Sequence, residues 1–209
     1  MQSPSLTLIV AATISNGIGA TGRLPWRLSK EMAYFAQMTS HVPEGSSLRN
    51  AVIMGRKTWE SIPLKFRPLK NRINVVVSRD ASSLTDSGVI KAGNLEEACA
   101  YTNPELHRRF LIGGAQMYAH ALASTSLQYS LDRILLTRIL EPEFEECDVF
   151  LPEFRQQDGG GLAIWRQAAH QELIDWAGFN VPEGAQEEKG VKYVYQMWVR
   201  KESARTDTN

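Results

Sequence analysis

Glu31 is the residue of this chain whose surroundings most suggest chemistry. It lies in the stretch LPWRLSKEMAYFAQM, just after the helix start that we expect at Ser29, a favourable N-cap residue. Helical spacing puts its carboxylate on or beside an apolar face formed by Leu28, Met32, Phe35 and Met38. Two interpretations are open. Glu31 either turns outward to cap its own helix or pair with Lys30, or it stands as a single acid in the wall of an apolar cleft and receives a cationic or donor-rich ligand.

Basic and hydroxyl residues follow two successive buried strands that the sequence predicts. The run at 50–55 (NAVIMG) is followed by Arg56, Lys57 and Thr58, and the run at 73–77 (INVVV) by Ser78 and Arg79. Thr58 can cap the helix that comes next. The carboxyl ends of parallel strands lie side by side, so Arg56 and Arg79 are expected to converge on one anion, such as the extra phosphate of NADP.

A diglycine, Gly113-Gly114, separates a short strand at 110–112 from a predicted helix that begins at Ala115. Two glycines let the backbone amides approach a ligand without a Cβ between them, and the helix N-terminus adds positive potential. The pattern is typical of a pyrophosphate site.

The glycines Gly17, Gly19 and Gly22 spell GxGxxG, the string of a dinucleotide-binding turn. In that turn a helix has already begun at the third glycine, whereas here Arg23 and Pro25 follow and the helical pattern starts only near Ser29. We therefore interpret this segment as a mobile flap across a cleft.

The other expected elements position these groups. A buried parallel strand is predicted at 6–12, a helix capped by Asn94 follows, and the loop at 62–72 is basic and punctuated by proline. The remaining predictions are a strand at 131–140, a turn at 148–152, a flexible GGG insert at 159–161, and a long antiparallel hairpin formed by 164–175 and 191–201.

Composition limits the class of protein. The chain has 209 residues, 43% of them hydrophobic, and equal numbers of basic and acidic residues, 23 each. We expect a single domain over 1–201, a polar tail at 202–209, and no global field that attracts nucleic acid or a membrane. Cys99 and Cys147 lack the spacing of a disulfide framework or a metal site. A cytoplasmic, monomeric, metal-free protein without a signal peptide or membrane span is expected.

Taken in order, the segments GIGATGRLPW, KEMAYF, VIMGRKTWESIP, RPLKNRINVVVSR, LIGGAQMY, LTRI, DVFLPEF and QEEKGVKYVYQMW resemble dihydrofolate reductase, particularly its longer fungal members. The resemblance covers nearly the whole chain. It implies an α/β fold: a mostly parallel, eight-stranded twisted sheet with an antiparallel C-terminal hairpin and flanking helices. It also implies reduction of 7,8-dihydrofolate to tetrahydrofolate by NADPH, and binding of antifolate inhibitors.

The resemblance assigns roles to individual residues. Glu31 matches the acid that holds the pteridine, Thr137 the hydroxyl that supports it, and Trp26 part of a water-mediated path to it. These three are the expected catalytic residues. It also implies a cis bond between Gly113 and Gly114, and a bidentate pair between Arg72 and the α-carboxylate of the substrate's glutamate.

Two larger sets of positions follow from the resemblance. The substrate would be bound by Ile9, Val10, Leu24, Glu31, Met32, Phe35, Ile62, Phe66, Leu69, Arg72, Ile112 and Tyr118. The cofactor would be bound by Ala11, Gly17, Ile18, Gly19, Gly22, Arg23, Arg56, Lys57, Thr58, Val77, Ser78, Arg79, Ile112, Gly113, Gly114, Ala115, Gln116, Met117 and Tyr118. Met32, Phe66 and Arg23 depart from the vertebrate pattern.

Two other functions are compatible with such a chain. One is an NADPH-dependent reductase of a pyrimidine in riboflavin synthesis, and the other is a non-catalytic relative that binds NADPH or RNA. The acid in KEMAYF and Arg72 favour a folate substrate.

Overall fold

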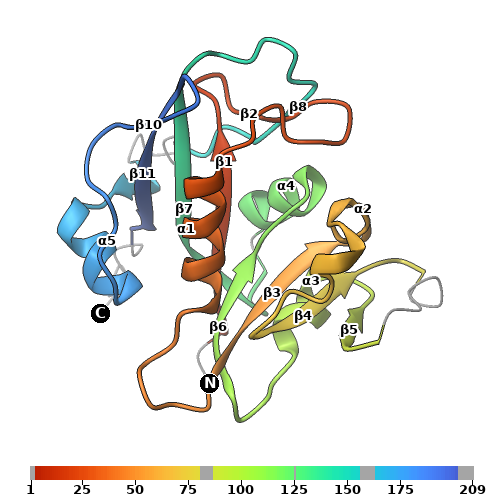
Figure 1. Cartoon of the computed structure of the whole chain (residues 1–209). Helices are drawn as coiled ribbons and strands as arrows, with labels where there is room; N and C mark the ends of the chain where they lie inside the picture. The colour runs from red at the N-terminus through yellow and green to blue at the C-terminus, as the bar shows by residue number, and fades with distance from the viewer. Residues whose placement is uncertain (1–2, 81–86, 125, 156–162, 202–209) are drawn as a thin grey trace, which may run out of the picture.

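The computed structural model describes residues 3–80, 87–124, 126–155 and 163–201. One sheet contains the strands β1 (Ser5–Ala12), β3 (Arg49–Gly55), β4 (Arg72–Val77), β5 (Val89–Ala92), β6 (Leu106–Leu111), β7 (Ser130–Glu141), β9 (Trp165–Gln167), β10 (Gln186–Glu188) and β11 (Val191–Arg200). Eight of them follow the order β10-β11-β7-β1-β6-β3-β4-β5, and β9 pairs with β11 beside this path (Figure 1).

The sheet is parallel from β7 to β5 and antiparallel where β11 joins it. Continuous apolar runs such as Leu6–Val10 are buried on both faces, which is why they form central parallel strands. The predicted mostly parallel, eight-stranded sheet is confirmed. The parallel pairing aligns the carboxyl ends of these strands, with Ala11 opposite Thr137.

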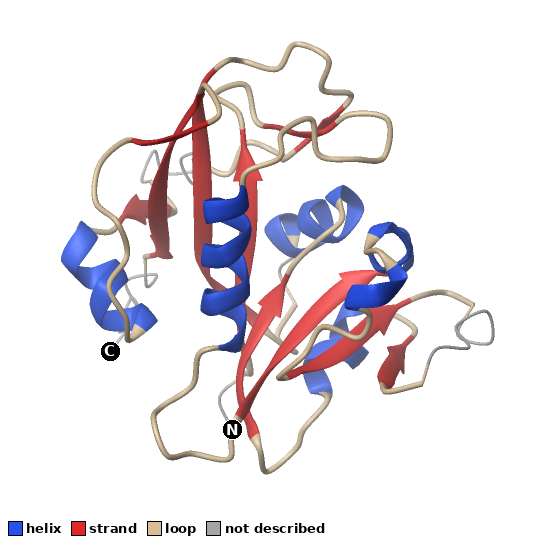
Figure 2. Ribbon diagram, in the orientation of Figure 1, coloured by secondary structure: helices blue, strands red, loops and turns tan. Residues whose placement is uncertain are grey.

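Helices cover both faces of the sheet: α1 (Ser29–Ser40), α2 (Arg56–Ser61), α3 (Leu95–Ala100), α4 (Ala115–Ala123) and α5 (His170–Ala177), with a 3-10 turn at Leu64–Phe66. One hydrophobic cluster lies under α3 and α4, and a second under α1, α2 and α5. Figure 2 shows α1 crossing in front of β1. Among the described residues, no helix is long and apolar enough to cross a membrane.

The predicted hairpin of 164–175 with 191–201 is wrong in its first arm. Only Trp165–Gln167 is a strand, antiparallel to β11, and His170–Ala177 is helix α5. Leu173 and Ala177, four positions apart, bury one face of α5, and Gly178 ends the helix with φ 78°. The hairpin partner of β11 is β10, joined to it through Lys189 and Gly190.

The flap is ordered by a small second sheet. β2 (Gly17–Gly19) pairs with β8 (Val149–Phe150), so the expected turn at 148–152 is in fact partly a strand. A Cβ on Gly17 would lie 2.7 Å from the Cβ and Sγ of Cys147, which explains the glycine. As expected, residues after Gly22 do not begin a helix until Ser29.

The sequence gives no expectation of strand β5, whereas the cap at Asn94 is confirmed, because its side chain accepts from the Glu97 amide at 2.7 Å. The GGG insert at 159–161 and the tail at 202–209 lie outside the described residues.

Candidate active site

Helix α1 turns Glu31 into the protein. The buried residues of the helix are Glu31, Tyr34, Met38 and Thr39, whereas Met32 is 49% exposed. The buried stripe therefore runs through Glu31 itself, and the expectation that Met32 belongs to it is wrong. Only 7% of Glu31 is accessible to solvent.

The Glu31 carboxylate is held from the neighbouring strand. The Thr137 hydroxyl, on β7, donates to Glu31 Oε1 over 3.1 Å. Burial raises the pKa of Glu31 to about 7; the Thr137 hydrogen bond acts in the opposite direction, and the charge of Glu188 adds to the rise. Of the two interpretations of Glu31, the structure supports the buried acid.

The N-terminus of α1 is capped from a distant part of the chain. The first helical residue is Ser29, so the expectation that Ser29 is the N-cap is wrong; Leu28 holds that position without a side-chain cap. The amides of Ser29 and Lys30 donate instead to Glu188 Oε1 and Oε2, at 2.7 and 2.9 Å. Local sequence patterns carry no signal for this contact.

Several polar atoms are buried without a hydrogen bond to any described residue, and two of them are on this side of the sheet close to Glu31 in the chain: the indole Nε1 of Trp26 and the hydroxyl of Tyr34. Buried polar groups are normally paired, so groups of this kind suit a site that binds a polar ligand or an ordered water. Tyr34 was not among the expected site residues.

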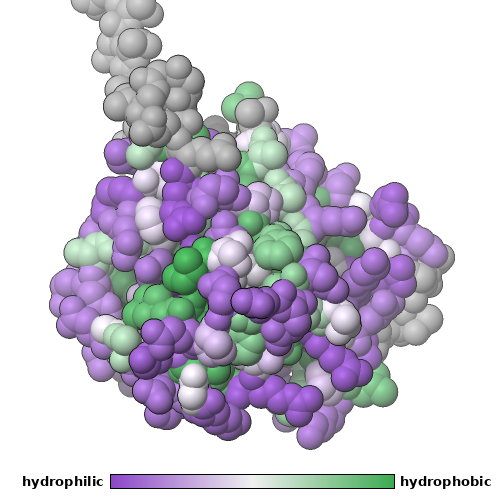
Figure 3. Space-filling model, turned by 90° about the horizontal axis from the view of Figure 1, so that it is seen from above, coloured by the Kyte–Doolittle hydropathy of each residue, from purple (hydrophilic) through white to green (hydrophobic). Residues whose placement is uncertain are grey.

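Apart from Glu31 and Arg72, the residues expected to bind the substrate fall into three groups. Ile9, Phe35, Ile62, Leu69 and Ile112 belong to the hydrophobic cluster under α1. Leu24, Met32 and Phe66 are about half exposed, at 48%, 49% and 56%. Val10 and Tyr118 pack in the cluster on the other face, so the side chain of Val10 points away from Glu31. Figure 3, looking down on the upper end of the molecule, shows apolar surface between hydrophilic margins.

Arg72 is oriented by two contacts. Its Nη1 donates to Thr39 Oγ1 at 2.8 Å and its Nε to the Lys70 carbonyl at 3.0 Å. Thr39 is on α1, which ties the guanidinium to the same helix that carries Glu31.

The diglycine turn lies against the carboxyl end of β3. The Gly55 amide donates to the Gly113 carbonyl at 2.8 Å, and the Gly113-Gly114 bond is cis, as expected. A Cβ on Gly114 would lie 3.1 Å from Thr58 Oγ1, and Gly113 has φ 128°. Only glycine leaves this backbone open to a ligand.

Helix α4 begins directly after this turn. The amides of Met117 and Tyr118 donate to the Gly114 carbonyl at 2.9 and 3.0 Å. These two amides are therefore satisfied within the helix, and the leading amides of the helix are those of Ala115 and Gln116.

The two basic strand ends are adjacent, as expected. In the parallel pair β3 and β4, Gly55 lies opposite Val77, so Arg56 and Ser78 follow at neighbouring positions. Arg56 is also 2.8 Å from Glu60, while Lys57 and Arg79 are exposed. Thr58 does not cap α2, whose N-cap is Gly55; its hydroxyl faces the diglycine turn instead.

The flap is anchored by a buried arginine that the sequence did not point to. Arg138, which is 4% exposed, donates from Nη1 to the Thr13 carbonyl and to Asn16 Oδ1, the latter at 2.9 Å. Ile18 packs against the cluster under α4, and an isolated bridge pairs Ala20 with Arg23.

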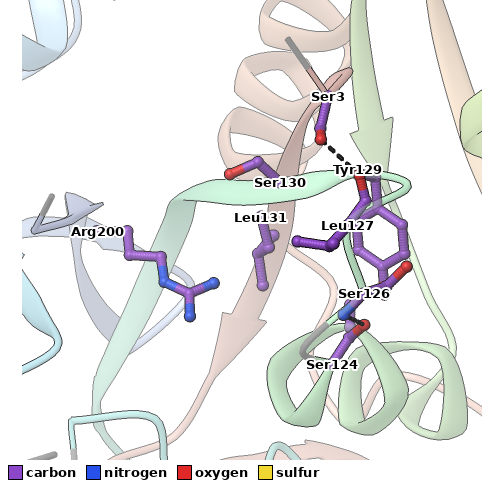
Figure 4. A pocket seen from close by; sticks show the side chains of 9 residues that line it. Ser3, Ser124, Ser126, Leu127, Tyr129, Ser130, Leu131 and Arg200 are labelled. Carbon is purple, nitrogen blue, oxygen red and sulfur yellow. Dashed lines mark hydrogen bonds between the residues drawn. The ribbon is translucent and has the colours of Figure 1, made fainter. Parts of the chain in front are cut away.

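A cavity of about 220 Å³ elsewhere in the protein is separate from this site (Figure 4). It is lined by Tyr129, Ser130 and Leu131, at the start of β7, whereas Thr137 lies near the end of the same strand. Six residues of strand span about 20 Å. The cavity is therefore at the opposite end of the sheet from Glu31.

A buried acid, an apolar cluster and a diglycine helix start meet at the carboxyl ends of parallel strands, where open α/β sheets bind their ligands. The fold and the site thus define an α/β enzyme. The family model described as dihydrofolate reductase matches residues 5–173. The chain is 43% identical to the dihydrofolate reductase of Pneumocystis carinii over 210 residues, covering 95% of this chain and 98% of that protein.

Two further comparisons agree. Identity to the dihydrofolate reductase of Cryptococcus neoformans is 44% over 230 residues, covering 95% of this chain and 96% of that protein. The solved structure of Schistosoma mansoni dihydrofolate reductase superposes with a TM-score of 0.74 at 33% identity, covering 96% of this chain and 100% of that one. The chain belongs to the dihydrofolate reductase family. It is an oxidoreductase that reduces dihydrofolate to tetrahydrofolate, and the family generally uses NADPH.

Proposed function

We propose that this chain reduces 7,8-dihydrofolate with NADPH in the cleft beside Glu31, and that Glu31 holds the pteridine. The observation that carries this proposal is the burial of the Glu31 carboxyl group, 7% exposed, with a hydrogen bond from Thr137. A carboxylate in an apolar wall is costly unless a complementary donor binds it. The amino group and ring N–H of a pteridine supply two such donors in one plane.

The rest of the substrate matches the groups around Glu31. The apolar side chains of Phe35, Ile62 and Leu69 suit the aromatic rings, and the exposed Met32 and Phe66 suit the mouth of the cleft. Arg72, oriented by Thr39, would take the α-carboxylate of the glutamate moiety as a bidentate pair. Antifolates with a protonated pteridine-like ring would bind Glu31 in the same way.

The residues present fit NADPH. Gly114 has no Cβ, and a Cβ there would lie 3.1 Å from Thr58 Oγ1. The backbone of the diglycine turn is therefore open to a pyrophosphate beside the start of α4. Lys57 and Thr58 would assist there. Arg56, Ser78 and Arg79 at the adjacent ends of β3 and β4 would hold the 2′-phosphate, and Ala11, Ile18 and Ile112 the nicotinamide.

NADPH supplies the hydride that reduces the imine carbon of dihydrofolate. The chain contributes orientation, because the apolar cluster and Glu31 fix the pteridine plane, and it excludes water from the reacting atoms. With a pKa of about 7, Glu31 carries a proton in a large share of molecules near neutral pH. We infer that Glu31 orients the pteridine and favours protonation of the imine nitrogen by a water in the cleft, near Trp26 Nε1.

The test is to follow NADPH absorbance with the purified chain and dihydrofolate, then with the ribosylated pyrimidine of riboflavin synthesis. Oxidation of NADPH with dihydrofolate alone is the expected result. Turnover of the pyrimidine alone, or of neither substrate, would contradict the proposal.

A further inference from the structure

Helix α1 receives its N-terminal cap from the hairpin β10–β11. Both oxygens of Glu188 accept backbone amides of α1, from Ser29 at 2.7 Å and from Lys30 at 2.9 Å. The next residue, Lys189, donates from Nζ to the Arg27 carbonyl at 3.1 Å. Two adjacent side chains of the hairpin thus contact Arg27, just before α1, and the first two residues of the helix. Figure 1 shows β10 near the upper end of α1, where the helix begins.

This cap takes the place of one that Glu31 could make. Glu31 is the third residue of α1, the position from which a glutamate can reach back to the backbone amide of the N-cap residue, here Leu28. Glu188 takes the amides of the first two helical residues and so stabilises the helix start without Glu31, and Glu31 turns into the protein toward Thr137. A self-capping Glu31 would point away from the pteridine.

The Glu188 charge also acts on Glu31. Although desolvation opposes it, hydrogen bonds from the Lys30 and Ser29 amides hold the pKa of Glu188 below its usual value, so Glu188 is ionised at neutral pH. Its charge then contributes to the raised pKa of Glu31. Among the described residues, the other titratable groups that interact with Glu31 are tyrosines. Burial raises their own pKa values, so they are neutral: Tyr34 on α1, Tyr118 on α4, and Tyr193 and Tyr195 on β11. Lys30 and Lys189 are the cations that face Glu188.

We propose that Glu188 is a positioning residue for the reaction: it caps α1 in place of Glu31 and so keeps the Glu31 carboxylate directed at the substrate. This inference rests on the proposed role of Glu31. It gives the C-terminal hairpin, 158 residues away along the chain from Lys30, a part in catalysis without any contact with substrate.

The experiment compares Glu188→Ala, Glu188→Gln and Glu187→Gln with the wild type. Glu187 is the exposed neighbour of Glu188 on β10, so Glu187→Gln changes the net charge equally but leaves the cap in place. For each protein, kcat and KM for dihydrofolate, KM for NADPH, the pH profile of kcat/KM and thermal unfolding are measured. Dihydrofolate binding to the protein without NADPH is followed by tryptophan fluorescence.

Glu188→Ala is expected to lower kcat/KM for dihydrofolate about tenfold, comparable to the loss of a helix cap, and to weaken dihydrofolate binding while KM for NADPH is unchanged. Glu188→Gln, which keeps one acceptor oxygen, should recover part of this loss. Its pH profile should move to lower pH, because the charge that raises the Glu31 pKa is gone.

Three results would overturn the inference: Glu188→Ala with wild-type kinetics and binding, equal losses toward dihydrofolate and NADPH, or the same pH shift in Glu187→Gln as in Glu188→Gln. If Glu188→Ala is too unstable to assay, Glu188→Gln decides: a kcat/KM for dihydrofolate and a dihydrofolate affinity equal to those of Glu187→Gln would overturn the inference. A wild type that binds dihydrofolate but does not reduce it would reject the proposed function, and the binding series would still test Glu188.

Discussion

The hydroxyl of Tyr118 donates to the carbonyl of Ile9 over 2.8 Å, inside the protein. Tyr118 belongs to α4, directly after the diglycine turn, and Ile9 to β1, in the cluster under α1. This hydrogen bond links the expected cofactor side of the site to the expected substrate side. Because burial raises the Tyr118 pKa, with a smaller contribution from the Glu31 charge, the hydroxyl remains protonated and can donate.

Tyr118→Phe should therefore destabilise the protein. The Ile9 carbonyl would lose its donor while staying buried, at a cost of about 1–3 kcal/mol in the free energy of unfolding. Urea unfolding measures this cost. Tyr34→Phe is the matched control, since Tyr34 is also buried but its hydroxyl makes no hydrogen bond to a described residue. Equal losses in both variants would show that the hydroxyl bond to Ile9 contributes nothing.

Glu31→Gln should separate substrate turnover from cofactor binding. Glutamine keeps the size of the side chain but has no negative charge and only one acceptor oxygen for the two N–H donors of the pteridine. Turnover of dihydrofolate should therefore fall by about a hundredfold or more. The dissociation constant of NADPH should stay nearly constant, because Glu31 lies on α1 and not at the diglycine turn. Steady-state kinetics and NADPH fluorescence titration measure the two quantities, and equal losses in both would contradict this division of roles.

The same variant should be more stable than the wild type at alkaline pH. The folded pKa of Glu31 is about 7, above the ordinary value of 4.5, so ionising this group costs folding free energy. The free energy of unfolding of the wild type therefore falls as pH rises from about 4.5 through about 7, whereas that of Glu31→Gln has no such dependence on this position. The difference should approach about 3 kcal/mol above pH 8 and vanish near pH 4. Urea unfolding across this pH range measures the difference. A difference between the two proteins that does not change with pH would contradict the raised pKa of Glu31.

Much of this architecture could be predicted from the sequence, and the failures have physical causes. Apolar runs such as 6–12 and 50–55 predicted buried parallel strands because both their faces are covered. The segment at 170–177 was misassigned because it was expected to continue the strand at 165–167, although its apolar spacing and Gly178 are helical signals. Strands such as β2 and β8 form through pairing between distant segments, which the local pattern does not show.

In the active site, too, local sequence patterns predict some residues and miss the contacts between distant segments. The spacing in α1 and the family resemblance together predicted Glu31. Met32, expected on the buried face, is half exposed, because the burial of a helix face depends on what it packs against. Glu188 caps a helix 159 positions earlier in the chain, and Arg138 anchors a loop 122 positions earlier. Patterns within a short window cannot reveal such partners.

Arg56, the first residue of α2 directly after β3, offers a test of the proposed 2′-phosphate site, with a control at the other end of β3. Arg56→Ala should raise KM for NADPH about tenfold, since a charge-assisted hydrogen bond is worth about 1.5–3 kcal/mol, and should leave KM for NADH unchanged because NADH lacks the phosphate. Arg79→Ala should act in the same direction. Arg49→Ala is the control: Arg49 begins β3, at the end far from Arg56, and pairs with Glu105 at 2.8 Å much as Arg56 pairs with Glu60. Steady-state kinetics with both cofactors measure the selectivity. If Arg49→Ala lowers the preference for NADPH as much as Arg56→Ala does, the effect is general electrostatics and the phosphate does not bind at the ends of β3 and β4.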